Sequence, residues 1–191
     1  MIMKREYDLY DFDRTVYRYD CESRFYLFCL LRRPYILPLL PYQMLCVLFR
    51  FTLNDRLKWM TRFFCYLRFV DAHKLIERFW QREQHNIRDF FLVKNRVRPA
   101  VICSESPFFL LEPIKRMYEV DIIIGTALDM KTLRSSGKIM RGENKVDAVK
   151  TLLPDAVFHS AYTDRPELDK PLLSLANNRF HVNKDGVITA I

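Results

Sequence analysis

The chain has 191 residues, of which 50% are hydrophobic and 28% are charged, a composition that supports one sizeable core and excludes wholesale disorder. Its formal net charge of +8 suits an anionic partner but does not choose between a phosphorylated metabolite, an acidic membrane surface and nucleic acid. With four glycines in the whole chain, there is little room for a Gly-rich phosphate loop.

Residues 6–13, EYDLYDFD, have the composition of a short strand that ends in an acidic cluster. Residues i and i+2 of an extended segment point the same way. We therefore expect Asp11 and Asp13 to face one ligand while Phe12 turns into the core. Thr15 follows two residues later. A helix-capping or turn role for the two aspartates is the alternative.

From about residue 21 to residue 88 the pattern becomes helical. Apolar and aromatic residues recur at helical spacing between Arg and Lys, which indicates aromatic packing rather than a cofactor site. Such interleaving also occurs on nucleic-acid-binding faces, although a solvated basic face is the simpler interpretation. Residues 32–51, RRPYILPLLPYQMLCVLFRF, are too short and too interrupted by proline for a transmembrane helix. A buried hairpin, a substrate-covering surface and a shallow contact with an anionic membrane stay open.

After residue 88, strands alternate with helices. We expect strands at 98–104, 120–128, 155–162 and 179–183, helices at 107–118, 144–153 and 172–176, and a turn at 184–186 after the last strand. This alternation predicts an α/β fold, a Rossmann-like three-layer core whose parallel sheet is covered on both faces. The helical block then becomes an insertion of residues 21–88 into a core of residues 1–20 and 89–191.

Polar residues fall at several predicted strand ends and helix starts. Asp11 and Asp13 end the first strand, Ser104 follows AVIC, Lys145 opens a helix, and Asp164 follows AVFHSAYT. Ligands of open α/β sheets collect beyond the carboxyl ends of the strands, so these residues can build one site. Ser104 as a helix cap and Lys145 as a solvated helix residue are the alternatives.

Taken in chain order, these features resemble the motifs of the haloacid dehalogenase superfamily of phosphohydrolases. DFDRT matches its DxDxT first motif, VICSESPFFLLEP looks like the second, GENK is similar to the third, and YTDRPELD resembles the acidic fourth motif. The similarity is to the phosphoserine-phosphatase-like branch and covers nearly the whole chain. It implies that residues 21–88 form a helical cap.

The resemblance implies a magnesium-dependent phosphatase that hydrolyses a small phosphomonoester. It assigns the nucleophile to Asp11, the proton donor and later the water-activating base to Asp13, the phosphoryl hydrogen bond to Ser104, and charge neutralisation to Lys145. Two carboxylates beside a phosphate require a cation. Magnesium prefers oxygen ligands, here expected from Asp11, the main-chain carbonyl of Asp13, and Asp164.

Two features depart from the family pattern. Arg165 follows the first aspartate of the fourth motif, where a small residue is common, and it could form a salt bridge with Glu167 or impair the metal site. The second acidic residue of that motif is Asp169 or Glu167. Glu105 adds a negative charge beside Ser104 and near the expected phosphate site.

The expected partner is a small phosphorylated substrate, phosphoserine being one candidate, and not nucleic acid. One alternative is a phosphatase acting on a phospholipid head group, suggested by residues 32–51. Another is a non-catalytic module of the same fold that binds a phosphorylated or nucleic-acid ligand. Five scattered cysteines without a CxxC pair fit a reducing compartment, and no signal-peptide pattern opens the chain, so we expect a cytoplasmic protein.

Overall fold

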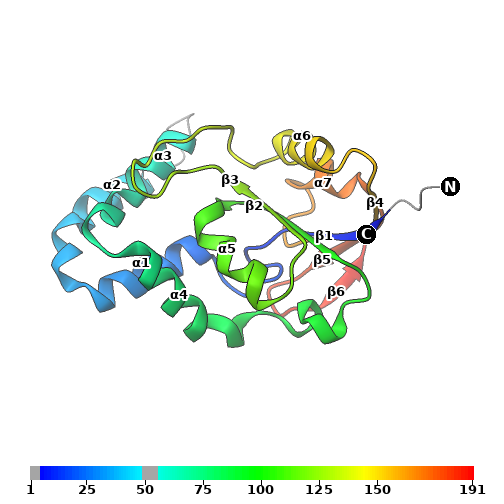
Figure 1. The fold of residues 1–191 in the computed structure, drawn as a ribbon, viewed down its shortest axis with the longest axis horizontal. Coiled ribbons are helices and arrows are strands. Elements are labelled where there is room, and N and C mark those ends of the chain that lie inside the picture. The colour runs from blue at the N-terminus through cyan, green and yellow to red at the C-terminus, as the bar shows by residue number, and fades with distance from the viewer. Residues whose placement is uncertain (1–4, 49–55) are drawn as a thin grey trace.

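The computed structural model of this chain describes residues 5–48 and 56–191. Within these residues, six strands form one sheet in the spatial order β3-β2-β1-β4-β5-β6 (Figure 1). The strands are β1 (Glu6–Tyr10), β2 (Ala100–Pro107), β3 (Ile122–Thr126), β4 (Val157–Thr163), β5 (Ala176–Val182) and β6 (Ile188–Ala190). The first five strands in this order, β3, β2, β1, β4 and β5, pair in parallel, and β6 runs antiparallel to β5. The predicted α/β fold is confirmed.

Helices cover both faces of this sheet, and each face has its own hydrophobic cluster. On one face, α6 (Glu143–Leu152) and α7 (Lys170–Leu173) pack in a cluster with Leu9. On the other face, α5 (Phe108–Met117) packs in a cluster with Tyr10. Leu9 and Tyr10 are neighbours in β1, and their separation follows from the alternation of side chains along a strand. The three-layer core is therefore present.

The chain between β1 and β2 is helical, as predicted. Helices α1 to α4 occupy the half of the molecule beyond the carboxyl end of β1, and the short helices that follow α4 run back beneath the sheet (Figure 1). The helices of this segment are α1 (Cys21–Arg32), η1 (Pro34–Leu39), α2 (Leu40–Leu48), α3 (Arg56–Phe63), η3 (Phe64–Phe69), α4 (Ala72–Glu83), η4 (Gln84–Asn86), η5 (Asp89–Phe91) and η6 (Val93–Asn95). The division of the chain into a core and a cap stays a prediction.

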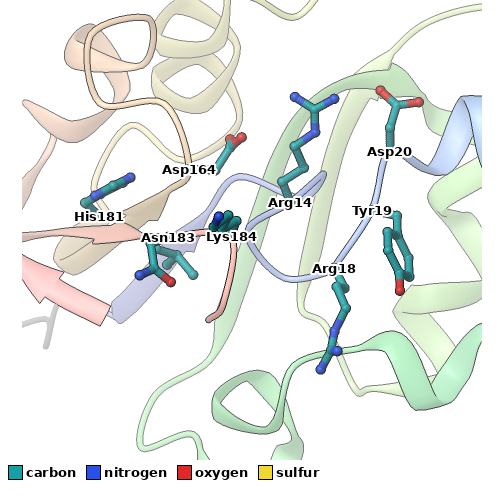
Figure 2. Close-up of a pocket in the computed structure, with 9 residues that line it drawn as sticks. Arg14, Arg18, Tyr19, Asp20, Asp164, His181, Asn183 and Lys184 are labelled. Carbon is teal, nitrogen blue, oxygen red and sulfur yellow. The ribbon is translucent and has the colours of Figure 1, made fainter. Parts of the chain in front are cut away.

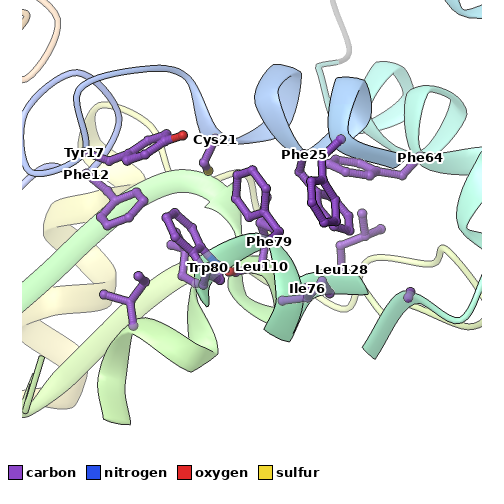
Figure 3. Packing of buried hydrophobic residues seen from close by; sticks show 14 of the residues in the cluster. Phe12, Tyr17, Cys21, Phe25, Phe64, Ile76, Phe79, Trp80, Leu110 and Leu128 are labelled. Carbon is purple, nitrogen blue, oxygen red and sulfur yellow. Dashed lines mark hydrogen bonds between the residues drawn. The ribbon is translucent and has the colours of Figure 1, made fainter. Parts of the chain in front are cut away.

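Aromatic side chains join these helices to the core (Figure 3). Phe12 and Tyr17, from the loop after β1, meet the ring of Trp80 with centroids 5.7 and 5.2 Å away. The Trp80 indole Nε1 donates a 2.6 Å hydrogen bond to the carbonyl of Leu110 in α5. Fully burying one large apolar side chain stabilises the fold by roughly 2 to 3 kcal/mol. The aromatic residues at helical spacing therefore form part of the hydrophobic core, as the sequence predicted.

Two local features, a helix cap at Asp20 and a glycine at position 125, set the geometry of the segments around the site. The Asp20 carboxylate accepts from the Ser23 amide at 2.9 Å and so starts α1 just after the acidic loop. Gly125 of β3 lies against the junction of β2 and α5. A Cβ at this position would be 2.9 Å from the Cα of Phe108 and from the carbonyl oxygen of Ser106. A side chain there would therefore push β3 away from the end of β2.

The arginine-flanked stretch of residues 32–51 forms η1 and α2 as far as residue 48, and residues 49–51 lie outside the described part. Ile36, Gln43 and Cys46 are buried, whereas most of the other side chains of η1 and α2 are exposed. None of the described helices has both the length and the apolar character needed to cross a membrane.

Two details of the C-terminal prediction are wrong. The helix expected at 172–176 is α7, which begins at Lys170 and ends at Leu173, and Ala176 already belongs to β5. Leu172 and Leu173 of α7 and Ala176 of β5 are buried in the same hydrophobic cluster. Apolar composition alone therefore did not show where the helix ends and the strand begins. The strand at 179–183 is also not the last, because β6 follows the turn and makes the sheet mixed. All residues of β6 are exposed, and it therefore lacks the alternation that marks a half-buried strand.

Candidate active site

The predicted site residues gather beyond the carboxyl ends of three adjacent strands. Asp11 follows β1, Ser104 lies in the last part of β2, and Asp164 follows β4. Lys145 lies in the first turn of α6, with its side chain buried. Their meeting at one edge of the sheet is what parallel strands with short connections impose. The catalytic roles assigned to them stay predictions.

A buried ion-pair triad links the first, third and fourth motifs. The Nζ of Lys145 lies 2.7 Å from Oδ1 of Asp11 and 2.8 Å from Oδ1 of Asp169. Burial raises the pKa of the Asp11 carboxyl to about 7, although the Lys145 ammonium acts in the opposite direction. Burial would lower the pKa of Lys145, but the two carboxylates more than reverse this and raise it. Lys145 is therefore a fixed positive charge beside Asp11.

The Asp13 carboxylate has different partners from Asp11. Its Oδ1 accepts from the amide of Cys21, the first residue of α1, at 2.7 Å, and its Oδ2 accepts from the Ser106 hydroxyl at 2.6 Å. The Ser106 amide in turn donates to Oγ of Ser104 at 3.2 Å. Burial and the nearby Asp20 raise the pKa of Asp13 to about 6. The carboxylates of the first motif are thus held by separate sets of donors rather than by one shared partner.

Thr15 connects the first motif to the fourth. Its hydroxyl lies 3.5 Å from Oδ2 of Asp11, to which it donates, and it accepts from the amide of Asp164 at 2.8 Å. Asp169 is held from the end of β4, because the Thr163 hydroxyl donates to its Oδ2 at 2.7 Å. These bonds fix the relative positions of Asp11 and Asp164 in a place where both side chains are largely buried.

The donor atoms fit a magnesium ion. Oδ1 of Asp164 is buried without a hydrogen-bond partner, at 3.6 Å from Nε of Arg165. Oδ2 of Asp11 has only the long bond from Thr15. Burial also raises the pKa of Asp164, a cost that a bound divalent cation would remove. No three His, Cys, Asp or Glu side chains among the described residues form a metal-binding group, and the expected set uses two carboxylates and one main-chain carbonyl.

The structure also places the residues that depart from the family pattern. Asp169, rather than the exposed Glu167, faces Lys145. Arg165 lies by Asp164 and not by Glu167. Glu105 forms ion pairs with Arg56 of α3 at 2.7 Å and with Arg141 at 3.3 Å. Its charge is therefore balanced by arginines from the insertion and from the loop before α6.

Ser106 and Thr163 are site residues that the sequence interpretation missed. Ser106 lies two residues after Ser104 in the same strand, and the alternation of side chains along a strand directs both hydroxyls to one face. The motif pattern names one hydroxyl only, and attention to the period of two would have found the second.

Comparison with known proteins identifies the family. A model of the haloacid dehalogenase-like hydrolase family matches residues 9–174, which include all the site residues above. The chain belongs to this family. The family predicted from the four motifs is therefore confirmed. Among curated proteins, none matches the chain.

Solved structures share the haloacid dehalogenase-like fold at low identity. A protein of unknown function from Bordetella pertussis Tohama I matches with a TM-score of 0.74 and 18% identity, over 93% of this chain and 89% of that one. A phosphoserine phosphohydrolase-like protein from Francisella tularensis gives 0.56 and 16%, over 93% and 86%. A probable phosphoserine phosphatase from Vibrio cholerae gives 0.62 and 13%, over 92% and 55%. These identities show a shared fold alone.

Proposed function

We propose that this haloacid dehalogenase-like hydrolase is a magnesium-dependent phosphatase that cleaves a small phosphomonoester through an aspartyl-phosphate intermediate. The observation that carries the proposal is the contact of Asp11 with Lys145 at 2.7 Å, beside an Asp13 carboxylate held by two donors of its own. A nucleophile next to a fixed cation, with a separately oriented acid, is what phosphoryl transfer to a carboxylate needs.

Each step uses groups of this chain. A carboxylate oxygen of Asp11 attacks phosphorus, and the bond from phosphorus to the ester oxygen breaks as Asp13 gives that oxygen a proton. Asp13 then takes a proton from the water that hydrolyses the acyl phosphate, which frees phosphate and restores Asp11. Lys145 and the Ser104 hydroxyl stabilise charge on the phosphoryl oxygens. A magnesium ion held by Asp11, the carbonyl of Asp13 and Asp164 would supply further charge neutralisation.

We also propose that residues 21–88 act as a cap over a core of residues 1–20 and 89–191. The Glu105–Arg56 ion pair supports this, because it joins the end of β2 to α3 of the insertion next to Ser104. Closure of the insertion would exclude water and select the leaving group.

A phosphate-release assay tests the activity. Wild-type protein should hydrolyse p-nitrophenyl phosphate with magnesium, lose turnover when EDTA removes the metal, and recover it when magnesium is returned. Asp11→Asn should show no turnover while keeping its thermal unfolding temperature within a few degrees. Absent turnover in the wild type would favour the non-catalytic binding module, and turnover that does not depend on metal would contradict the magnesium-dependent mechanism.

A second candidate substrate class is the phosphorylated head group of a membrane lipid. The helices α1, η1 and α2 expose a group of apolar side chains, among them Leu31 and Leu48 at 69% exposure each; the others are Leu27, Tyr35, Leu37, Tyr42, Met44 and Leu45. Residues 23–70 contain eight Arg or Lys and one Asp, so the same segment carries most of the net charge. Exposed apolar groups with a basic surround fit an anionic bilayer surface.

Vesicle flotation separates the two substrate classes. Binding to vesicles that contain anionic lipid, lost in a Leu31→Glu, Leu45→Glu double variant, would favour the lipid head group. Leu152→Glu is the matched control, since Leu152 is also more than half exposed but lies on α6. Absence of flotation with any vesicle would favour a small metabolite such as phosphoserine.

A further inference from the structure

A basic hollow borders the candidate active site at the carboxyl ends of β4 and β5. It has a volume of about 580 Å³, and its wall includes Asp164 of the expected metal set. The lining residues are Arg14, Arg18, Tyr19, Asp20, Asp164, His181, Val182, Asn183 and Lys184 (Figure 2). In open α/β sheets this edge is where ligands bind.

The cations of the hollow form no close ion pair, although Arg14 is near enough to Asp164 to lower the pKa of that carboxyl. Within residues 5–48 and 56–191, the side chains of Arg14, Arg18 and Lys184 form no ion pair and no hydrogen bond. The two carboxylates of the wall have other tasks, because Asp20 caps α1 and Asp164 is expected at the metal. Three unpaired cations around one hollow favour a negatively charged occupant.

A fourth cation lies beneath the hollow. Arg88 is only 6% exposed, and one of its terminal nitrogens donates to the main-chain carbonyls of Arg14, Asn183 and Lys184, at 3.3, 3.2 and 3.0 Å. Its Nε is buried without a hydrogen-bond partner. In the described part of the chain, no carboxylate forms an ion pair with Arg88. Burial and the nearby Arg18 lower the pKa of Arg88, and the more distant Asp185 and Asp164 offset this only in part. A buried charge without a close counterion is costly, and an anion in the hollow would offset that cost.

Arg14, on the rim of the hollow, has a backbone conformation that is costly for an arginine. Arg14 has φ of +63°, a region in which glycine is the least costly residue. Its amide donates to the carbonyl of Tyr19 at 3.0 Å, and its own carbonyl accepts from Arg88. These two bonds hold the loop in the conformation that glycine adopts most readily, so an arginine at this position costs stability that a glycine would not.

We propose that this hollow binds a second anionic group of the substrate. The proposal rests on the proposed phosphatase function and names its substrate class: phosphomonoesters whose leaving alcohol carries a carboxylate or a further phosphate. The scissile phosphate would lie at Asp11 and Lys145, and the second anion would reach past Asp164 to Arg14, Arg18 and Lys184.

Matched substrates test this class. Glycerol 3-phosphate has a neutral leaving alcohol, 3-phosphoglycerate adds a carboxylate, and glycerol 1,3-bisphosphate adds a phosphate. Wild-type kcat/KM should be about tenfold or more higher for at least one of the doubly anionic esters, since a charge-assisted contact of this kind is worth about a factor of ten. Comparison of the two esters tells which anion the hollow takes.

The variants Arg14→Gly, Arg18→Ala and Lys184→Ala should remove this preference, chiefly through KM, and leave kcat/KM for p-nitrophenyl phosphate unchanged. Arg14→Gly should also fold at least as well as the wild type, because it relieves the positive φ. Lys150→Ala is the charge-matched control, as Lys150 is exposed in the last turn of α6. No wild-type preference, or a preference that survives in all three variants, would overturn the proposal.

Calorimetric titration of Asp11→Asn with the same three esters reads binding without turnover. Weaker binding of the doubly anionic esters in the hollow variants would support the site even if wild-type protein failed to hydrolyse p-nitrophenyl phosphate, an outcome that would count against the phosphatase alone. Equal affinity for all three esters would count against the hollow alone.

Discussion

Replacing Ser106 by alanine tests whether Asp13 works as an acid held in place by its surroundings. The two oxygens of the Asp13 carboxylate accept from different residues, one from the Cys21 amide at 2.7 Å and the other from the Ser106 hydroxyl at 2.6 Å. Ser106→Ala removes the hydroxyl donor, so the carboxylate is held on one side only, by Cys21, and can rotate away from the leaving group. The neighbouring Ser104 keeps its own hydroxyl and its place in β2.

The size of the effect follows from the bond that is lost. A hydrogen bond to a charged group contributes about 1.5 to 3 kcal/mol, which corresponds to roughly 10- to 150-fold in a rate constant. If the loss falls on protonation of the leaving alcohol, kcat for an alkyl phosphate such as glycerol 3-phosphate should drop by about this factor. p-Nitrophenyl phosphate should lose less than about threefold, because its phenolate leaves with little need for a proton.

Steady-state kinetics on both substrates distinguish this role from a structural one. Ser104→Ala is the comparator, since loss of a phosphoryl donor should slow both substrates alike. Ser106→Thr keeps the hydroxyl and should restore most of the alkyl phosphatase activity. An equal loss on the two substrates in Ser106→Ala, or no loss on either, would refute the assignment.

Other parts of the molecule make further predictions. Lys145→Met should destabilise metal-free protein by about 3 kcal/mol in urea unfolding, because two buried carboxylates lose their shared cation, and magnesium should recover part of the loss. Gly186→Ala should cost about 2 kcal/mol, since φ of +91° is strained for any L side chain and the new Cβ would displace the Arg88 guanidinium; an unchanged unfolding midpoint would contradict this. Burial raises the pKa of Glu83, but hydrogen bonds, including those from Arg24, outweigh it and lower the pKa below 4.5. Glu83 therefore stabilises the fold above that pH and loses its contribution as the pH falls through the lowered value, so the stability difference between wild type and Glu83→Gln should shrink in acid.

The sequence motifs predicted which residues meet at the site, but not all of the hydrogen-bond partners of those residues. The meeting of Asp11 with Lys145, 134 residues away in the chain, follows from strand ends that share one edge of a parallel sheet. The partner of Asp13 did not follow, because the second motif assigns a role to the hydroxyl of Ser104 and none to Ser106, two residues later in the same stretch. The choice of Asp169 over Glu167 was also open until α7 placed one of them next to Lys145.

Local order along the chain determined the family, the alternation of strands and helices, and the helical block after the first strand, since periodicity and motif spacing are properties of neighbouring residues. Only the tertiary structure decided which charges are paired. It placed the Arg88 guanidinium against three main-chain carbonyls from distant segments, left Arg14, Arg18 and Lys184 without a close ion pair, and added the exposed strand β6. The physical reason is that ion pairing and burial depend on distances between segments far apart in the chain, and no local pattern encodes those distances.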